Sequence, residues 1–180
     1  MPPEHDQHPG DRGSGNRGSE DFVAREQGGL LRLAVLLAGD RGHAEDLVQT
    51  ALLRSYRHWA RITRGGDPTA YVRRVLVTTH TSWRRRLSTT EQVVEALPDR
   101  AAAAAGEDDE ELRAALRALP PRMRTAVVLR YYADLSEAQT AAAMGCSAST
   151  VNTQTTRGLA RLRVALQPTA PAALTSEESS

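Results

Sequence analysis

The residues best suited to chemistry in this sequence gather on one face of a helix expected over residues 148–166. Apolar and small residues recur at helical spacing and are expected to point inward: Val151, Thr155, Leu159 and Leu162. Polar side chains share another face of the same helix: Asn152, Thr153, Thr156 and Arg157. Such groups match the donors and acceptors that base edges present in the DNA major groove. Arg161 and Arg163 are better placed for phosphates.

A helix-turn-helix pattern over residues 136–164 positions that face. Ser136 followed by Gln139 reads as a capping box that opens a short helix. Gly145 stands where a tight turn needs a positive φ, and Ser147 is a good N-cap for the last helix. A plain helical hairpin with a solvated polar face is the alternative interpretation.

Arginines mixed with aromatic rings form a second candidate surface within residues 54–86. This segment has nine Arg and a single acid. Aromatic side chains are interleaved with it, among them Trp59, Tyr71 and Trp83. Arginine for phosphates and rings for stacking is the chemistry that a single strand or an opened duplex requires. Rings at helical spacing also suit a hydrophobic core, and the run Arg84–Arg86 also suits a solvated helix end.

The charge pattern separates two basic blocks. All 23 basic residues are Arg, and the formal net charge is +1. Residues 20–88 carry 12 Arg and 7 acids, residues 89–111 carry 1 and 8, and residues 112–167 carry 8 and 2. The block charges of +5, −7 and +6 indicate two modules that face a polyanion, with an acidic segment between them.

Apolar periodicity predicts an all-α fold of two small helical bundles joined by an acidic linker. Helices are expected over 21–38 and 43–60, from Pro68 to the Arg run, from about 108, from Pro121, over 137–144 and over 148–166, with a loop at 61–67. The predicted organisation is a disordered tail 1–19, a first bundle 20–88, a flexible linker 89–108, a second bundle 109–166 that ends in the helix-turn-helix, and a disordered tail 167–180.

Several classes of protein are excluded by missing signals. No apolar stretch approaches about 18 residues, and the N-terminus has no apolar signal region. The lone Cys146 allows neither an internal disulfide nor a Cys-based zinc site, and the His spacing suits no metal. No nucleotide-binding loop or GxSxG motif is present. We expect a cytoplasmic protein without catalytic activity, metal or cofactor, because a DNA-processing enzyme would need a larger domain for its nucleophile.

Three helical stretches and the short acidic linker together make the chain resemble a bacterial sigma factor of the extracytoplasmic-function type, in the sigma-70 family. Residues 39–59 resemble the polymerase-binding helix of the sigma-2 domain, and residues 68–86 resemble its promoter-opening and minus-ten-reading helix. Residues 116–163 resemble the sigma-4 domain. The resemblance covers about residues 20–166 and implies a factor that binds core RNA polymerase and directs promoter recognition and transcription initiation.

The resemblance also implies partners and site residues. The partners are core RNA polymerase, through its β′ clamp coiled coil and β flap, promoter DNA and an anti-sigma factor, with no membrane insertion and a monomeric free chain. Asp46 and Gln49 would contact the polymerase, and residues 61–67 would capture a flipped minus-ten base. The downstream-element residues would be Arg61, Arg64, Thr78, Thr79, Ser82, Arg84 and Arg85. The upstream-element residues would be Ser149, Thr150, Asn152, Thr153, Thr156, Arg157 and Arg161.

Three positions depart from the family pattern. A basic residue is usual at Asn152 and an Asn is usual near Thr78, which leaves the promoter preference open. Gly158 replaces a more usual Ala inside the last helix, at an expected cost of about 1 kcal/mol in helix propensity. A hypothesis of a different class is a stand-alone helix-turn-helix regulator that binds duplex DNA as a dimer. It requires two-fold symmetry and paired half-sites, and the sequence shows no obvious dimer stripe beyond the predicted cores.

Overall fold

Eight helices make up the regular structure of residues 12–89 and 107–167, the part of the chain that the computed structural model describes. Their bounds are α1 Arg12–Ala38, α2 Arg41–Tyr56, α3 Trp59–Gly65, α4 Pro68–Thr89, α5 Glu107–Ala118, α6 Pro121–Tyr131, α7 Glu137–Met144 and α8 Ala148–Ala165. No strand occurs within these residues, which confirms the predicted all-α class.

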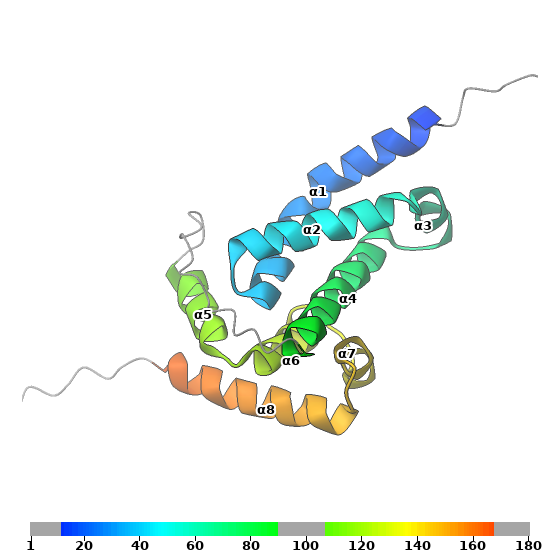
Figure 1. The fold of residues 1–180 in the computed structure, drawn as a ribbon. Helices are drawn as coiled ribbons and strands as arrows, with labels where there is room; N and C mark the ends of the chain where they lie inside the picture. Colours follow the sequence, from blue (N-terminus) through cyan, green and yellow to red (C-terminus); the bar gives the residue numbers. More distant parts are fainter. Residues whose placement is uncertain (1–11, 90–106, 168–180) are drawn as a thin grey trace, which may run out of the picture.

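The first four helices form one bundle. α1 and α2 lie side by side, α3 continues beyond the end of α2, and α4 crosses back beneath them (Figure 1). The three largest fully buried side chains of α1 are leucines, Leu30, Leu33 and Leu37, and α4 contributes Leu76. α4 begins as predicted, because the Asp67 carboxylate accepts a hydrogen bond from the Thr69 backbone at 2.8 Å.

The last four helices place the helix-turn-helix on a supporting helix. α8 packs along α6, and α7 contacts both of them (Figure 1). The predicted capping box is present, since the Ser136 side chain accepts from the Gln139 backbone and the Gln139 side chain accepts from the Ser136 backbone. Gly145 has a φ of 64°, and Ser147 caps α8 by accepting from the Thr150 backbone. The predicted turn chemistry is therefore confirmed.

Several boundaries differ from the prediction. The single helix expected over 43–60 is interrupted at Arg57 and His58, where α2 ends and α3 begins. α1 begins at Arg12, so residues 12–19 are helical rather than part of a disordered tail, and Ser19 is buried. The expected loop over 61–67 is helical up to Gly65, because Trp59 and Ile62 turn into the core and hold a seven-residue helix. Arg61 and Arg64 are thus helical residues. Residues 1–11, 90–106 and 168–180, which hold the rest of the predicted tails and linker, lie outside the described part.

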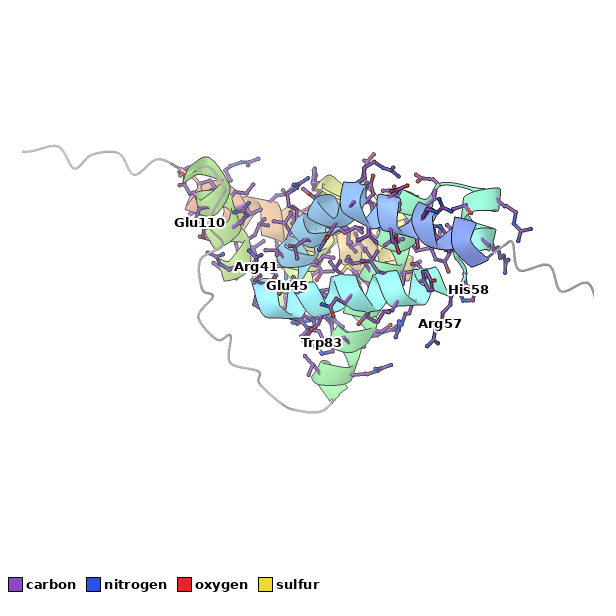
Figure 2. All side chains as sticks on the ribbon, turned by 90° about the horizontal axis from the view of Figure 1, so that it is seen from above. Arg41, Glu45, Arg57, His58, Trp83 and Glu110 are labelled. Carbon is purple, nitrogen blue, oxygen red and sulfur yellow. The ribbon has the colours of Figure 1, made fainter. Side chains whose placement is uncertain are left out.

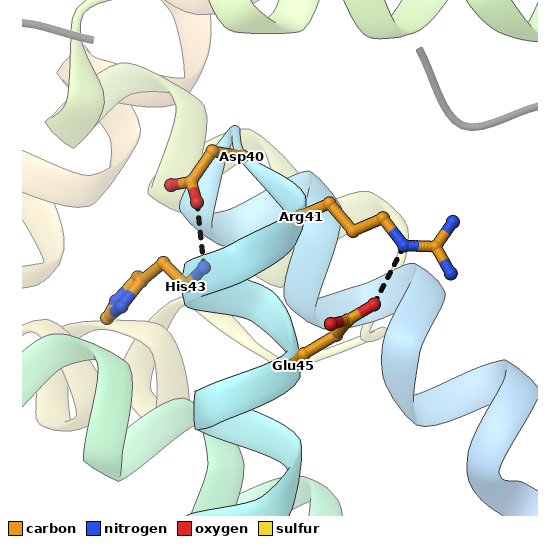
Figure 3. A network of polar contacts seen from close by, with 4 residues as sticks. All are labelled: Asp40, Arg41, His43 and Glu45. Atoms are coloured by element: carbon orange, nitrogen blue, oxygen red, sulfur yellow. Dashed lines mark hydrogen bonds and ion pairs between the residues drawn. The ribbon is translucent and has the colours of Figure 1, made fainter. Parts of the chain in front are cut away.

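The sharp turn between α1 and α2 is fixed by local polar contacts. Gly39 has a φ of 87°, a conformation that favours glycine. The Asp40 carboxylate accepts a hydrogen bond from the His43 backbone at 2.7 Å, and Arg41 pairs with Glu45 across the first turn of α2 at 2.7 Å (Figure 3). The turn brings the end of α1 close to the helix α6 of the other bundle.

The two bundles pack against each other through a shared set of buried side chains. One hydrophobic cluster joins residues of α1, α2 and α4 to residues of α5, α6 and α8. At its edge the buried Arg124 of α6 donates to the Ala38 carbonyl at 2.9 Å. A Cβ on Gly39 would lie 2.5 Å from the Arg124 Nη1 atom, so the guanidinium occupies the space that glycine leaves. A cation at a helix C-terminus is favourable, so this contact stabilises the packing of the two bundles.

His80 of α4 is buried in the same contact region. Its Nε2 atom lies 3.5 Å from the Thr125 hydroxyl of α6. Burial, together with the nearby charges of Arg84, His43 and Arg124, lowers the pKa of His80 to about 3. The imidazole is therefore neutral in the folded chain at neutral pH.

Gly158 is required by the close approach of α6 and α8. A Cβ at this position would lie 2.7 Å from Val127 Cγ2. We predict that Gly158→Ala destabilises the protein by up to about 2 kcal/mol, because overpacking of about 1–3 kcal/mol outweighs a propensity gain of about 1 kcal/mol. Gly28→Ala, in the middle of α1 with only the Arg32 side chain nearby at 3.7 Å, should instead stabilise it by about 0.5–1 kcal/mol. Urea unfolding of both variants measures this, and a stabilised Gly158→Ala would contradict the prediction.

The neutral His80 predicts a loss of stability in acid. The unfolded chain binds a proton at this residue below pH 6.5, whereas the folded chain does so only near pH 3. The contribution of neutral His80 to the free energy of unfolding should therefore be complete above pH 6.5. As the pH drops toward 3, the free energy of unfolding should fall by up to about 1.4 kcal/mol per pH unit. His80→Gln should flatten the pH dependence of urea unfolding, and His58→Gln, at an exposed position, should leave it unchanged. Equal slopes for wild type and His80→Gln would refute this assignment.

Candidate nucleic-acid interface

The outward face of α8 presents the polar residues expected at the upstream element. Asn152, Thr153, Thr156 and Arg157 are all exposed, while Val151 and Thr155 are buried. Arg161 is exposed one turn further along, and Ser149 and Thr150 lie in the first turn, exposed and half-buried respectively. The structure therefore brings the seven predicted upstream residues together on one helix.

Hydrogen bonds hold several of these side chains in place before any partner arrives. The Thr156 hydroxyl lies 3.2 Å from Asn152 Oδ1 and donates to it, which leaves the amide NH₂ of Asn152 free to donate. Thr153 donates to the Ser149 carbonyl at 2.9 Å, and the hydroxyls of Ser149 and Thr150 both lie 2.9 Å from that of Ser147. Ordered side chains lose less entropy on binding, so the face is suited to reading base edges.

The charge of α8 adds a phosphate-binding component. The helix carries three Arg and no acid. Among the residues that the structure describes, neither Arg157 nor Arg161 has an ion-pair or hydrogen-bond partner. These guanidinium groups are available for DNA phosphates or for guanine, the two most frequent arginine contacts in duplex recognition.

The predicted downstream residues are divided over two helices. Arg61 and Arg64 are exposed on α3, and Thr78 is exposed in the middle of α4. The Thr79 hydroxyl donates to the Val75 carbonyl at 2.7 Å and accepts from Arg54 of α2 at 3.1 Å. Its hydroxyl is therefore partly occupied by the bundle itself.

Three further downstream residues lie at the end of α4, where it meets α6 and α7. At 100° per residue, Thr78, Ser82 and Arg85 share a stripe, whereas Arg84 points about 120° away. Arg84 is half-buried and lines a small cavity with Arg122 of α6. Arg85 approaches the turn between α7 and α8, because a Cβ on Gly145 would lie 3.3 Å from its Nη1 atom. In this arrangement the second bundle covers part of the downstream set.

Of Trp59, Tyr71 and Trp83, only Tyr71 is exposed, and Trp83 is half-buried. Trp59 is buried and lies 5.0 Å, between ring centroids, from Phe22. Trp83 stacks on His43, with ring centroids 3.8 Å apart, next to α2 (Figure 2). Tyr71 is 37% exposed on α4. A stacking role for Trp59 and Trp83 is therefore not available in this arrangement.

A third exposed surface follows α2. Asp46 and Gln49 are exposed as predicted, and two large apolar side chains continue the same stripe, Leu53 at 68% and Tyr56 at 53% exposure. Their spacing of three, four and three residues puts all four on one side of the helix. This stripe lies between the Arg41–Glu45 pair and Arg57 at the two ends of the helix (Figure 2).

The apolar end of this stripe borders a groove of about 510 Å³ between α1 and α2. Its lining includes Phe22, Leu52, Leu53, Tyr56 and Trp59. Sequence reasoning missed Leu53 and Tyr56. The exposed sector of the helical wheel shared with Asp46 and Gln49 was the signal that could have identified them.

Comparison with known proteins assigns two family regions to this chain. Residues 22–90 match the model of Sigma-70 region 2, and residues 109–162 match that of Sigma-70, region 4. The RNA polymerase sigma-E factor of Streptomyces avermitilis is 40% identical over 151 residues, which span 82% of this chain and 84% of that protein. The sigma-E factor of Streptomyces coelicolor is 41% identical over 147 residues, covering 80% and 83%.

A solved structure shares the fold. The sigma factor RpoE of Bartonella quintana, crystallised with the anti-sigma factor NepR, superposes with a TM-score of 0.62 at 21% identity. The match covers 86% of this chain and 99% of that one. At this identity the likeness concerns the arrangement of helices.

Proposed function

Because this chain belongs to the sigma-70 family, in its extracytoplasmic-function group, we propose a division of work between its two bundles. As an RNA polymerase sigma factor it binds core polymerase and directs promoter recognition. The alternative of a stand-alone dimeric regulator is not favoured, since both family regions occur in one chain in the order expected for a sigma factor. In vitro transcription with core polymerase and mapping of start sites tests the function directly, and no association with core at physiological salt would reject it.

We propose that α8 reads the upstream, minus-thirty-five element as a duplex. The observation that carries this is the ordered, exposed face that combines Asn152, Thr156 and Arg157 with no acid anywhere on the helix. The Thr156 hydroxyl fixes the Asn152 amide, and Arg161 would position the helix on the backbone.

Substitutions on α8 should separate base reading from phosphate binding. Arg157→Ala should cost about 1–3 kcal/mol on the preferred upstream sequence and relax the preference at one base pair. Arg161→Ala should weaken binding to all promoter sequences alike, and it should lower the number of ions released on binding by about one, as seen in the salt dependence of the affinity. Binding of the polymerase complex to promoter variants over a salt series measures both effects. If Arg157→Ala leaves start-site choice unchanged, the face assignment is wrong.

We propose that the stripe on α2 is the main contact with core polymerase, at its β′ clamp coiled coil. Asp46 and Gln49 supply polar contacts, and Leu53 and Tyr56 supply the apolar area beside the groove. Hot spots of protein interfaces are commonly aromatic and lie near a pocket, as Tyr56 does. The second bundle would contact the β flap.

Leu53 offers a sharp test of this surface. Leu53→Gln should weaken binding to core polymerase about tenfold or more, because burial of a leucine contributes about 1.5–3 kcal/mol. Val164→Gln, at an apolar position that is 72% exposed on α8, is the matched control and should bind nearly as well as wild type. Titration of labelled protein with core enzyme measures the affinities. Equal losses in the two variants would argue against a specific role for the stripe.

We propose that downstream, minus-ten recognition uses α3 and the exposed face of α4. Arg61 and Arg64 would contact an opened strand, with Thr78, Thr79 and Ser82 facing the element. Arg84 and Arg85 would join them only after the second bundle leaves the end of α4. Extrusion of a base costs a few kcal/mol, which the captured contacts must offset.

We further propose that an anti-sigma factor covers the α2 stripe, as one is bound to the structural neighbour from Bartonella quintana.

Sigma-70 factors are transcription initiation factors, and we propose that this chain has no catalytic activity. It would act in the cytoplasm, where polymerase is found. Within residues 12–89 and 107–167, none of the helices combines the length and apolarity needed to cross a bilayer.

A further inference from the structure

A small cavity between the two bundles is lined by three arginines, and the promoter contacts proposed above give no role to one of them, Arg122. It has a volume of about 70 Å³. α4 supplies Thr81, Arg84 and Arg85, α6 supplies Pro121, Arg122 and Thr125, and α7 supplies Met144. Three of these seven residues are arginines and none is acidic. Arg84 lies in its half-buried part, and Arg85 and Arg122 are exposed at its mouth.

Two of these arginines line the cavity from opposite bundles, and no acidic side chain of the lining balances their positive charge. Arg84 of α4 and Arg122 of α6 line the same cavity, and burial together with the positive charge of Arg122 lowers the pKa of Arg84. Within the described residues, neither has a hydrogen-bond or ion-pair partner. Like charges brought together and partly out of water are costly unless an anion joins them.

The surrounding groups suit an anion. The N-terminus of α6 opens at the cavity with Pro121 as its first residue, and no side chain caps it. Backbone N–H groups at a free helix N-terminus attract negative charge. Thr81 and Thr125 line the cavity from the two opposite helices, but they are not counted as donors to an anion, because the Thr81 hydroxyl donates to the Val77 carbonyl at 3.0 Å and the Thr125 hydroxyl lies 3.5 Å from His80 Nε2. The volume is enough for one tetrahedral oxyanion, which occupies the space of a few water molecules.

We propose that this cavity binds a single phosphate group, held by Arg84 from the first bundle and by Arg122 and the α6 N-terminus from the second. The planar guanidinium forms paired hydrogen bonds with the oxygens of phosphate, which favours phosphate over chloride. A ligand that contacts both bundles stabilises their packed arrangement. The site goes beyond promoter recognition, and its test uses the free chain, so that failure of either proposal leaves the other standing.

The first experiment measures the melting temperature of the full-length protein against inorganic phosphate at pH 8 and constant ionic strength, with sodium chloride as the balancing salt. A specific site gives a rise that follows the logarithm of one plus the ratio of phosphate concentration to Kd. Arg122→Gln should weaken the response about tenfold or more, since it removes one charge-assisted contact. Arg32→Gln, at an exposed position on α1, is the matched control and should respond like wild type.

A second variant keeps the proposal testable should Arg122→Gln change the fold. Arg122→Glu places a carboxylate beside Arg84, so the protein should melt higher without phosphate and lose its response to added phosphate. Equilibrium dialysis with labelled phosphate should give about one ion per wild-type chain. A response that does not saturate, or that is the same in Arg122→Gln and Arg32→Gln, would overturn the proposal.

The source of the phosphate group is resolved by competition. A nucleoside diphosphate that displaces labelled phosphate at lower concentration than unlabelled phosphate does would identify a phosphorylated small molecule, and the reverse order would identify the free anion. Either result supports the site. A short single-stranded DNA that displaces phosphate more effectively than both would make the cavity part of the DNA interface and overturn the small-ligand proposal.

Discussion

The packing of the two described bundles, joined by one hydrophobic cluster, is tied to the α1–α2 turn by one buried guanidinium. Arg124 crosses from α6 to the end of α1, where it donates to the Ala38 carbonyl and lies over Gly39. Its two Nη atoms donate to carbonyl groups, since a second contact reaches the Arg117 carbonyl at 3.4 Å, whereas its buried Nε atom has no hydrogen-bond partner among the described residues. A cation held this way contributes up to about 2 kcal/mol at a partly buried helix terminus, and its removal leaves the carbonyls unpaired. The contact requires a residue without a side chain at Gly39, so the α1–α2 turn and the packing of the bundles are fixed together.

This packing has a direct bearing on the two reading surfaces. The α8 face remains exposed while the end of α4, with Arg84 and Arg85, rests against α6 and α7. The chain therefore presents its proposed upstream surface completely and its proposed downstream surface in part. The interface that covers Arg84 is also rich in positive charge and poor in acids, which limits its stability. An interface of this kind is suited to being opened by a larger partner such as polymerase.

Sequence reasoning recovered the elements that have strong local signals. Asp67, Ser136, Gln139, Gly145 and Ser147 were placed correctly because capping and turn chemistry act within a few residues. The α3 helix was missed, since residues 61–65 look like a loop and only the burial of Trp59 and Ile62 makes them helical. The significance of Gly158 was also hidden, because its cause is Val127 on another helix. The positions of Arg84 and Arg124 depend on contacts between the bundles, which no local pattern encodes.

The turn between α7 and α8 has a further consequence because it touches the end of α4 through Gly145 and Arg85. The direction in which α8 leaves that turn is set by contacts with a helix of the other bundle as well as by α6. Residues far apart in the sequence thus share control of where the recognition helix points. If α8 reads the upstream element as proposed, substitutions in α4 would change promoter choice without altering any residue of the α8 face.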